Sequence, residues 1–498
     1  MPIPLIDLFA GPGGLNEGFS SVTDSKGQSI FQTALSVEMD EFAHRTLELR
    51  ALFRRLRPAH NIENYIAYVQ GSISRDVLFD RSGVHGAAAR AETMRAKMGD
   101  SDSTDREIET RISSALKKSV GKEFVLIGGP PCQAYSLVGR ARRRHETREK
   151  FEADPKHRLY EEYLRIVSKF RPAVFLMENV PGLLSARLNG ASMFSRIYND
   201  LLQAGYDLHP INNPGDQLCE SETDPKRFIV HSEEHGVPQA RSRVFILGIR
   251  KDLGLKARTL EPSTKERASV GDVLGDLPRI RSRVSRQPDS ALQWRDEIVK
   301  LGDHKFNGLD PAMRRFLDHN LPTINPKLPL GAQFMAADAK PAKLAAWLDG
   351  SAVGGVLNHN SRGHMASDLR RYFFWSAYAS IHGRSPSLAD VPHFLRPDHE
   401  NVKGDATDAP FADRFRVQLP TKPSTTVTCH IAKDGHYYIH HDPQQCRSLS
   451  VREAARIQTF PDTYYFEGPV TEQYKQVGNA VPPFLAKQIG DLVARILR

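Results

Sequence analysis

The chain contains one cysteine and one glutamate whose positions suit covalent catalysis. Cys132 follows a short apolar run through two glycines and two prolines, in FVLIGGPPCQAYS, and Glu178 follows another apolar run, in FLMENVPGLL. A thiolate is the strongest nucleophile among side chains, and a carboxyl group can activate an electrophile by donating a proton. Each residue alone also has a structural explanation, the cysteine as an apolar core residue and the glutamate as a helix cap. Together they predict attack by Cys132 on an electrophile that Glu178 protonates.

A glycine-rich loop near the N-terminus has the features of a nucleoside-binding site. In IDLFAGPGGLNEGF the loop stands between an apolar run and an expected helix, and its glycines allow the backbone to approach a ligand closely. Glu38 ends the next apolar run, where a carboxylate can accept hydrogen bonds from ribose hydroxyls. The loop has neither the Gly-Lys-Ser/Thr of a Walker motif nor the G-x-G-x-x-G spacing of NAD-binding proteins. The loop therefore predicts a nucleoside cofactor, with a tight strand–helix connection as the structural alternative.

Two groups of basic residues could contact phosphates or a base. Gln239, Arg241 and Arg243 occupy alternate positions in VPQARSRVFILGIR, so an extended backbone would project them to one face. Such a face is either a planar array of donors or an exposed polar strand face. The run GRARRRHETREK, residues 139–150, follows Cys132 closely in the chain. We interpret it as a phosphate-contacting loop, with a solvated helix face as the alternative.

Four apolar runs predict the strands of a parallel sheet, because each is followed by polar or glycine-rich residues and the runs alternate with helical patterns. They lie at residues 3–9, 31–37, 124–127 and 173–177. Ligands of such sheets bind at the carboxyl ends of the strands, so the segments that follow these runs are expected to share one cleft. The predicted fold is α/β, a Rossmann-like sheet with helices on both faces, plus a second, smaller domain.

Three segments are expected from the changes of pattern along the chain. Residues 1–250 form the domain with the sheet and include a charged helical insert at about 86–119. Residues 251–445 are richer in Pro, His and Arg and lack regular strand–helix alternation, which predicts a separate domain. In residues 446–498, apolar side chains fall on one face of a helix that begins near Pro483, so this segment is expected to pack back on the first domain.

The composition of the chain favours some classes of protein and binding partner and excludes others. Of 498 residues, 68 are Lys or Arg and 59 are Asp or Glu, and the net charge of +9 favours a polyanionic partner. The four cysteines are scattered singly, so neither a disulfide framework nor a zinc finger can be drawn, and we expect no bound metal. No apolar stretch is long enough to span a membrane and the apolar N-terminus lacks a basic leader, which predicts a cytoplasmic protein.

Six segments, in this order, resemble the motif set of the DNA cytosine carbon-5 methyltransferases. They are DLFAGPGG, GGPPCQAYS, MENVPGLL, QARSR, REAARIQTFPDTY and QVGNAVPP. The segment 251–445 falls where this family has its variable target-recognition domain. The resemblance implies the Rossmann-like fold of class I methyltransferases, S-adenosylmethionine as the cofactor, and double-stranded DNA as the partner.

The resemblance also assigns roles to residues of this chain. Cys132 would add to carbon 6 of a flipped-out cytosine while Glu178 assists at ring nitrogen 3, and Arg241 and Arg243 would hold the base and the active-site loop. The residues expected around the cofactor are Phe9, Gly11, Gly13, Gly14, Glu38, Met39, Ile73, Pro131, Leu159, Asn479 and Ala480. The residues expected to contact DNA are Gln133, Ser136, Arg140, Arg142, Arg143, Arg144, Asn179, Gln239, Arg362 and His364. Ile73 belongs to Gly71-Ser72-Ile73, which has serine where the family commonly has an aspartate for the adenine amino group.

We therefore predict a monomeric, nucleoid-associated enzyme that methylates carbon 5 of cytosine in a specific duplex sequence. Its role would be restriction-modification or DNA protection, with a cognate restriction endonuclease as a further partner. The alternatives are a tRNA cytosine-5 methyltransferase, a non-catalytic DNA-binding relative and a Rossmann oxidoreductase that acts on small molecules. The length of the segment 251–445 disfavours the tRNA enzyme, because its recognition region is small. The presence of Cys132 and Glu178 disfavours the non-catalytic relative.

Overall fold

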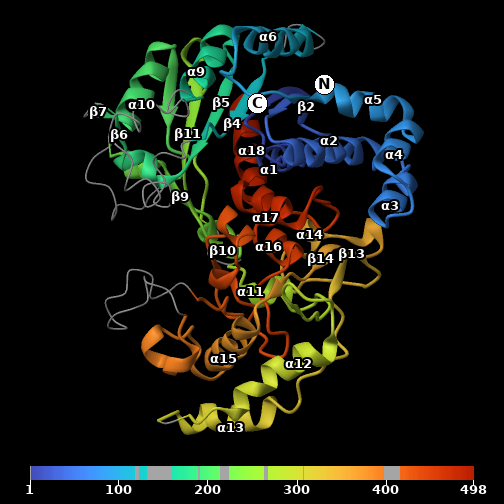
Figure 1. Ribbon diagram of the computed structural model, residues 1–498. Helices are drawn as coiled ribbons and strands as arrows, with labels where there is room; N and C mark the ends of the chain where they lie inside the picture. The colour runs from blue at the N-terminus through green and yellow to red at the C-terminus, as the bar shows by residue number, and fades with distance from the viewer. Residues whose placement is uncertain are drawn as a thin grey trace. The chain divides into compact units, whose positions relative to one another are not determined.

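The structure is a computed structural model that describes residues 2–117, 123–131, 159–188, 191–212, 224–262, 267–306, 308–397 and 415–498 (Figure 1). The chain divides into two compact units. Unit 1 consists of residues 1–68, 73–267 and 480–498, and unit 2 consists of residues 69–72 and 268–479. The boundary between the domains therefore lies near residue 267, later than the expected position of 250.

Unit 1 contains a central sheet of eight strands within the described residues. The strands are β1 (Ile3–Leu8), β2 (Phe31–Glu38), β3 (Thr93–Arg95), β4 (Val125–Gly128), β5 (Val174–Asn179), β8 (Tyr206–His209), β9 (Ile229–His231) and β11 (Ser242–Arg250). Their order is β3-β2-β1-β4-β5-β11-β8, with β9 beside β11. Neighbouring strands from β3 to β5 are parallel, and β11 runs antiparallel to its three neighbours. The expected α/β fold and all four expected strands are confirmed.

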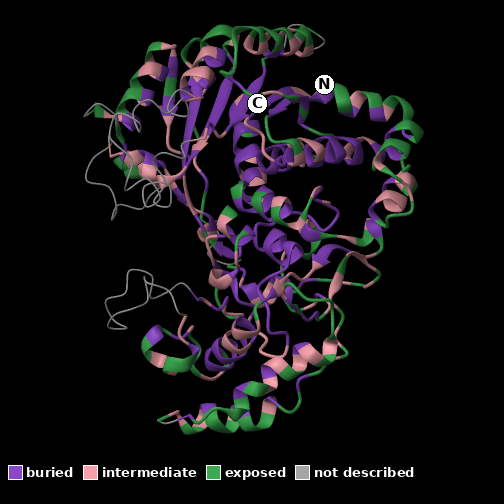
Figure 2. Cartoon of the chain, in the orientation of Figure 1, coloured by how far each residue is buried: buried purple, intermediate pink, exposed green. Residues whose placement is uncertain are grey.

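Helices cover both faces of this sheet. The helices that lie wholly or mainly in unit 1 are α1 (Gly14–Ser20), α2 (Glu41–Leu56), α3 (Glu63–Val69), α4 (Arg75–Arg81), α5 (Gly83–Glu92), α6 (Asp102–Lys117), α9 (Leu159–Phe170), α10 (Met193–Gln203) and α18 (Pro483–Leu497). Side chains of β1 alternate between two apolar cores, because Ile6 and Leu8 pack with α6, α9 and α10 while Leu5 packs with α1 and α18. The strands are mostly buried and the outer helices are largely exposed (Figure 2).

Helix α18 lies against α1 at very short range (Figure 1). A Cβ atom added at Gly18 of α1 would lie 2.4 Å from the Cβ of Ala486 in α18, so only glycine permits this approach. The expectation that a helix beginning near Pro483 packs back on the first domain is confirmed. None of the described helices is long and apolar enough to cross a membrane.

The charged insert differs from the expectation of surface helices alone. Helix α5 leads directly into β3, which pairs in parallel with the end of β2, and only then does α6 follow. The break between the two helices is therefore an edge strand of the sheet. Its sequence, Thr-Met-Arg, is too short to show a strand pattern.

The shorter elements of unit 1 connect these strands and helices. They are the 3-10 helices η2 (Pro181–Ser185), η3 (Pro225–Phe228), η4 (Ser232–His235) and η5 (Lys251–Leu253), and the strands β6 (Arg187–Leu188), β7 (Ala191–Ser192) and β10 (Gln239–Ala240).

Unit 2 has short strands and helices around a separate aromatic core. Its helices are α11 (Val270–Leu274), α12 (Ala291–Val299), α13 (Pro311–Asn320), α14 (Ala345–Leu348), α15 (Ala366–His382), α16 (Val451–Ile457) and α17 (Val470–Asn479). Its strands are β12 (Arg283–Val284), β13 (Gly331–Met335), β14 (Val356–Asn360), β15 (Gly363–His364) and β16 (Ser424–Thr425). Trp294 of α12 and Tyr372 and Trp375 of α15 are buried in this core.

The segment 446–479 belongs to unit 2, which corrects the expectation that the whole of 446–498 returns to the first domain. Contacts of two buried arginines hold it there. The fully buried Arg456 contacts Asp276 at 2.6 Å, and Arg447, which contacts both carboxylate oxygens of Glu453 at 2.6 Å, also donates to the carbonyl oxygen of Ile280 at 3.1 Å. A helical pattern in the sequence cannot show which core a helix joins when charged side chains make the contacts. The return to unit 1 begins at Ala480.

One histidine of unit 2 is held in its neutral form. Nε2 of His359, on β14, lies 2.8 Å from the carbonyl oxygen of Pro278, and Nδ1 lies 2.8 Å from Oγ of Ser450. A carbonyl oxygen only accepts, so Nε2 carries the proton and Nδ1 accepts from the serine. Burial lowers the pKa of His359 to about 4.

We predict that unit 2 loses stability on acidification. A histidine with an unfolded pKa near 6.5 and a folded pKa of about 4 stabilises the fold above pH 6.5, and this contribution is lost as the pH falls toward 4. The loss for His359 is up to about 3 kcal/mol. Urea unfolding between pH 7 and 4 should show a smaller decrease in His359→Gln than in the wild type. The exposed His319→Gln is the control, and an unchanged decrease in His359→Gln would contradict the assignment.

Candidate active site

The carboxyl ends of four parallel strands lie side by side in unit 1. Leu8 of β1 is aligned with Val37 of β2 and with Gly128 of β4, and Gly128 is aligned with Met177 of β5. The four segments that follow these strands therefore start at one edge of the sheet. This edge brings together the glycine-rich loop, the glutamate that ends β2, the Gly-Pro segment after β4 and the glutamate of β5, as expected from the sequence.

The glycine-rich loop leaves β1 through a strained turn. Phe9 has φ +56°, a left-handed conformation that is rare for residues other than glycine and is found preferentially at functional sites. Gly13 (φ +94°) is the N-cap of α1, and Gly14 packs so tightly that an added Cβ would lie 2.4 Å from the carbonyl oxygen of Val481. No atom of the described residues lies within 4 Å of the Cβ position at Gly11, which leaves open space beside the loop.

Glu38 closes this loop on the side of β2. Its Oε2 accepts a hydrogen bond from the amide of Gly11 at 2.7 Å, and its Oε1 accepts one from the amide of Asp40 at 2.7 Å. Burial raises the pKa of Glu38, and these two amides partly offset that effect. The next residue, Met39, is 55% exposed. A buried carboxylate, open space beside a glycine and an exposed apolar side chain fit the ribose and base of a nucleoside cofactor.

Glu178 and Arg243 form an ion pair at the same edge. Nε of Arg243 lies 2.9 Å from Oε1 of Glu178, and the two side chains are 13% and 14% exposed. Burial lowers the pKa of Arg243, and Glu178 counteracts this shift. A Cβ atom at Gly129 would lie 2.9 Å from Oε2 of Glu178, so glycine leaves room for the carboxyl group. Asn179 donates from Nδ2 to the carbonyl oxygen of Pro130 at 3.1 Å, which connects the ends of β4 and β5.

Gln239, Arg241 and Arg243 do not form one donor face. Strand β10 ends at Ala240 and β11 starts at Ser242, so Arg241 stands at a break. Gln239 and Arg241 are 0% and 1% exposed, which overturns the expectation that Gln239 contacts DNA. Arg241 donates to the carbonyl oxygen of Ala480 at 2.9 Å, where the chain returns to unit 1. The burial of these two side chains could not be predicted from the sequence, because polar residues at alternate positions are equally typical of an exposed strand.

Three other residues expected at the cofactor are placed as follows. Pro131 is half-buried and continues the segment after β4, Leu159 is half-buried and begins α9, and Asn479 is exposed and ends α17. Ile73 lies in the bend before α4 and does not follow a strand of the sheet. The strand beside β2 is β3, and the residues after it are Ala96 and Lys97. The expectation for Ile73 is wrong, because the chain inserts four helices, α2 to α5, between β2 and β3.

The expectation that His364 contacts DNA is also overturned. Its side chain is 4% exposed, and burial lowers its pKa well below the usual range. The guanidinium group of Arg362 is half-buried, lies 4.3 Å from the ring centroid of Tyr474 and donates to the carbonyl oxygen of Ile431. Among the residues that the structure describes, no cluster of three or more His, Cys, Asp or Glu side chains could hold a metal ion.

Several predicted site residues lie outside the described residues. They are Cys132, Gln133, Ser136, Arg140, Arg142, Arg143 and Arg144. Their roles stay predictions from the sequence.

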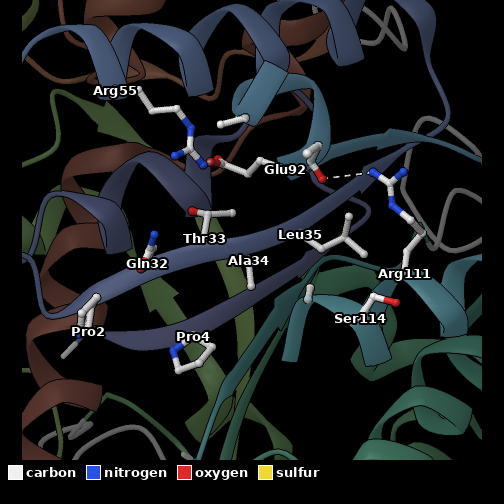
Figure 3. A pocket seen from close by; sticks show the side chains of 13 residues that line it. Pro2, Pro4, Gln32, Thr33, Ala34, Leu35, Arg55, Glu92, Arg111 and Ser114 are labelled. Carbon is white, nitrogen blue, oxygen red and sulfur yellow. Dashed lines mark hydrogen bonds and ion pairs between the residues drawn. The ribbon is translucent and has the colours of Figure 1, made fainter. Parts of the chain in front are cut away.

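A pocket of about 540 Å³ lies at the opposite ends of β1 and β2 (Figure 3). Its lining includes Pro4, Gln32 and two arginines whose guanidinium groups have partners. Arg55 pairs with Glu92 at 2.6 Å, and Arg111 donates to two carbonyl oxygens of the chain around β3. The pocket therefore does not belong to the site at the carboxyl ends, and its charges are largely compensated by the protein itself.

Comparison with known proteins decides the family. The profile of the family "C-5 cytosine-specific DNA methylase" matches residues 90–495. The Type II methyltransferase M.Bpa9945I of Bacillus paralicheniformis is 32% identical over 506 residues, which cover 99% of each chain. The chain belongs to the C-5 cytosine-specific DNA methylase family. Its enzyme class is accordingly DNA (cytosine-5-)-methyltransferase.

Two further relatives are similar to the chain, and a solved structure shares its fold. The Type II methyltransferase M1.HphI of Haemophilus parahaemolyticus is 26% identical and the match covers 87% of each chain. The DNA (cytosine-5-)-methyltransferase M.ApeKI of Aeropyrum pernix is 27% identical, with 75% of this chain and 81% of the relative covered. A crystal structure described as a prophage-encoded DNA modification methyltransferase (E. coli) has 19% identity, a TM-score of 0.55 and 99% coverage of both chains, and it supports the fold.

Two features of the site were missed in the sequence. Gly129 is one of two adjacent glycines in a loop, and nothing in the sequence distinguishes the one that faces Glu178. Asp7 is buried on β1, and an acidic residue inside an apolar strand is the signal that could have found it.

We predict that Arg243→Gln lowers the rate of methyl transfer to DNA by roughly 10- to 100-fold, because Glu178 loses the cation that orients it. The measurement is the incorporation of labelled methyl groups into DNA at saturating cofactor. Arg250→Gln is the matched control, because Arg250 lies on the same strand and contacts Glu123 at 2.8 Å far from the site. Equal activities of the two variants would refute the role of the pair.

Proposed function

We propose that the protein transfers a methyl group from S-adenosylmethionine to carbon 5 of cytosine in a specific duplex DNA sequence. The observation that carries this proposal is the edge where the glycine-rich loop and Glu38 lie beside the Glu178–Arg243 pair. The glycine-rich loop and Glu38 would bind the nucleoside part of the cofactor, and Glu178 provides a carboxyl group beside them. The family of the chain supports the same reaction.

The cofactor would supply an electrophilic methyl group attached to a positively charged sulfur. Glu38 would accept hydrogen bonds from the ribose hydroxyls, and Met39 would pack on the adenine. The loop of Phe9, Gly11 and Gly13 would surround the methionine part, with Ala480 completing the wall.

The chain's own residues would activate cytosine in two coupled steps. The thiolate of Cys132 adds to carbon 6 of the ring, while Glu178 delivers a proton to ring nitrogen 3, so that the ring becomes an enamine with a nucleophilic carbon 5. Arg243 bonds Oε1 of Glu178 and thereby orients the carboxyl group toward the base. After methyl transfer, the proton on carbon 5 passes to solvent, the thiolate departs from carbon 6, and the proton on ring nitrogen 3 returns to Glu178, which restores the aromatic ring.

Recognition of DNA would fall mainly to unit 2 and to the basic run after Cys132. The target carbon is inaccessible inside a duplex, so the nucleotide must leave the stack at a free-energy cost of roughly a few kcal/mol. Contacts between basic side chains and phosphates provide a sequence-independent part of the binding free energy that offsets this cost. Asn179 would lie near the extruded base, since it is next to Glu178.

The names of two relatives support a role in restriction-modification. M.Bpa9945I and M1.HphI both carry Type II methyltransferase names, which supports a partner endonuclease that cuts the same DNA sequence. We propose that the enzyme acts as a monomer and protects its host's DNA at that sequence.

Bisulfite sequencing of DNA from cells that express the chain tests the function. We predict complete or near-complete methylation of one cytosine in a single short sequence, and none in cells that express Cys132→Ala. The variant should still bind S-adenosylmethionine, because the nucleophile is not part of the cofactor site. Cys429→Ala, which removes an exposed cysteine, is the control and should methylate normally.

Two outcomes would redirect the proposal. Methylation of tRNA with unmodified DNA would favour the tRNA enzyme, and methylation of DNA by Cys132→Ala would refute the nucleophile. A covalent complex with DNA that contains 5-fluorocytosine, seen as a band of reduced mobility in a denaturing gel, should form with the wild type and not with Cys132→Ala.

We also predict that the basic run contacts phosphates. Replacing Arg142, Arg143 and Arg144 by Gln should weaken DNA binding and reduce the slope of log K against log[salt] by about 0.9 for every phosphate that these arginines neutralise. Fluorescence anisotropy at several salt concentrations measures this slope. An unchanged slope would return the run to the alternative of a solvated helix face.

A further inference from the structure

Asp7 is the one charged residue of β1, and the reaction proposed above gives it no role. Its side chain is 1% exposed, and neither carboxylate oxygen has a hydrogen-bond partner among the described residues. A buried carboxyl group without aligned donors destabilises a folded protein, and such groups in native structures are concentrated at functional sites. The side-chain amide of Asn16, which acts on Asp7, already donates to Oγ of Ser36 at 3.0 Å.

Asp7 lies directly before the loop of the candidate cofactor site. It is the penultimate residue of β1, and it is aligned with Ser36 of β2. The amide of Asn16, on α1, is close enough to favour the ionised carboxylate, and Glu38 is close enough for its like charge to oppose it. Two buried acids therefore interact electrostatically at the adjacent ends of β1 and β2.

The described cation that acts on Asp7, and the arginine one turn before it on the same helix, are already engaged by other acids. Arg54 of α2 favours the ionised form of Asp7, but its guanidinium group contacts Glu92 at 2.6 Å and lies 3.8 Å from Glu17. Arg50, also on α2, donates to Glu17 at 2.8 Å. Within the part of the chain that the structure describes, the negative charge of Asp7 is therefore left without a cation of its own.

The surroundings of Asp7 make its charge responsive to a ligand. Burial raises the pKa of its carboxyl group well above the usual range. Tyr163 of α9, the titratable group that couples to Asp7 from the other face of the sheet, stays neutral because burial raises its own pKa. A cation placed beside the loop would favour the ionised form of Asp7.

We propose that Asp7 is a positioning residue that favours the cationic sulfonium of S-adenosylmethionine over the neutral thioether of S-adenosylhomocysteine. The inference rests on the proposed function. When the sulfonium binds, the O–H bond of protonated Asp7 breaks, the proton passes to the solvent, and the carboxylate remains buried behind the loop. When the thioether binds, the carboxyl group keeps its proton. The charge of ionised Asp7 would then favour binding of the cofactor over the product and so help the enzyme to exchange one for the other.

The test compares the two ligands on the full chain by isothermal titration calorimetry between pH 5.5 and 8.5. We expect the ratio of their affinities, cofactor over product, to rise about tenfold with pH in the wild type, which lies within the range usual for coupling between two sites. In buffers of different ionisation enthalpy, cofactor binding should release up to one proton more than product binding. The amino and carboxyl groups that both ligands carry cancel in this comparison.

The variants are Asp7→Asn, which keeps the shape and removes the charge, and Asp24→Asn in an exposed turn as the control. Asp7→Asn should bind the product as the wild type does, with a ratio that no longer changes with pH. An affinity ratio that does not change with pH in the wild type would overturn the inference. So would an undiminished rise of the ratio with pH in Asp7→Asn, because the pH dependence would then come from Glu38. If the variant does not fold, the pH dependence of the affinity ratio and the proton release of the wild type still test the inference. Failure of both ligands to bind the wild type would contradict the proposed function instead.

Discussion

The parallel register of β1, β2, β4 and β5 is the constraint on which the site depends. Because the ends of these strands are aligned residue by residue, the segments that follow them all start at the same edge of the sheet. Each segment is then fixed by a short-range contact across a strand boundary, from Gly11 to Glu38 and from Asn179 to Pro130. The two halves of the site are held by the backbone of the sheet and not by a flexible hinge.

Buried charges are compensated in most places and left uncompensated in a few. Buried arginines meet carboxylates in both units, as Arg447 meets Glu453 in unit 2 and Arg50 meets Glu17 in unit 1. At the ends of β1 and β2, by contrast, Glu38 is buried with backbone amides and Asp7 without a described hydrogen-bond partner. Compensated charges specify how elements pack, whereas uncompensated charges are tolerated where a ligand can interact with them.

The part of the fold that follows from local patterns could be predicted from the sequence. Apolar runs that end in glycine or an acid indicated the strands, and one apolar helix face indicated the packing of α18 on the first unit. Edge strand β3 could not be found, because three residues carry no periodicity, and the misplacement of Ile73 followed from this omission. The burial of Gln239 and His364 depends on residues distant in the chain, which a pattern of neighbours does not contain.

The position of α18 has a consequence for biosynthesis. This helix covers the apolar face of α1, and Gly18 touches α18 directly, yet the two helices lie near opposite ends of the chain. A ribosome adds roughly 5–20 residues per second, so α1 is synthesised tens of seconds before α18, the helix on which it packs. An unfinished chain therefore exposes the apolar face of α1, and the core of unit 1 is completed only when α18 has been made.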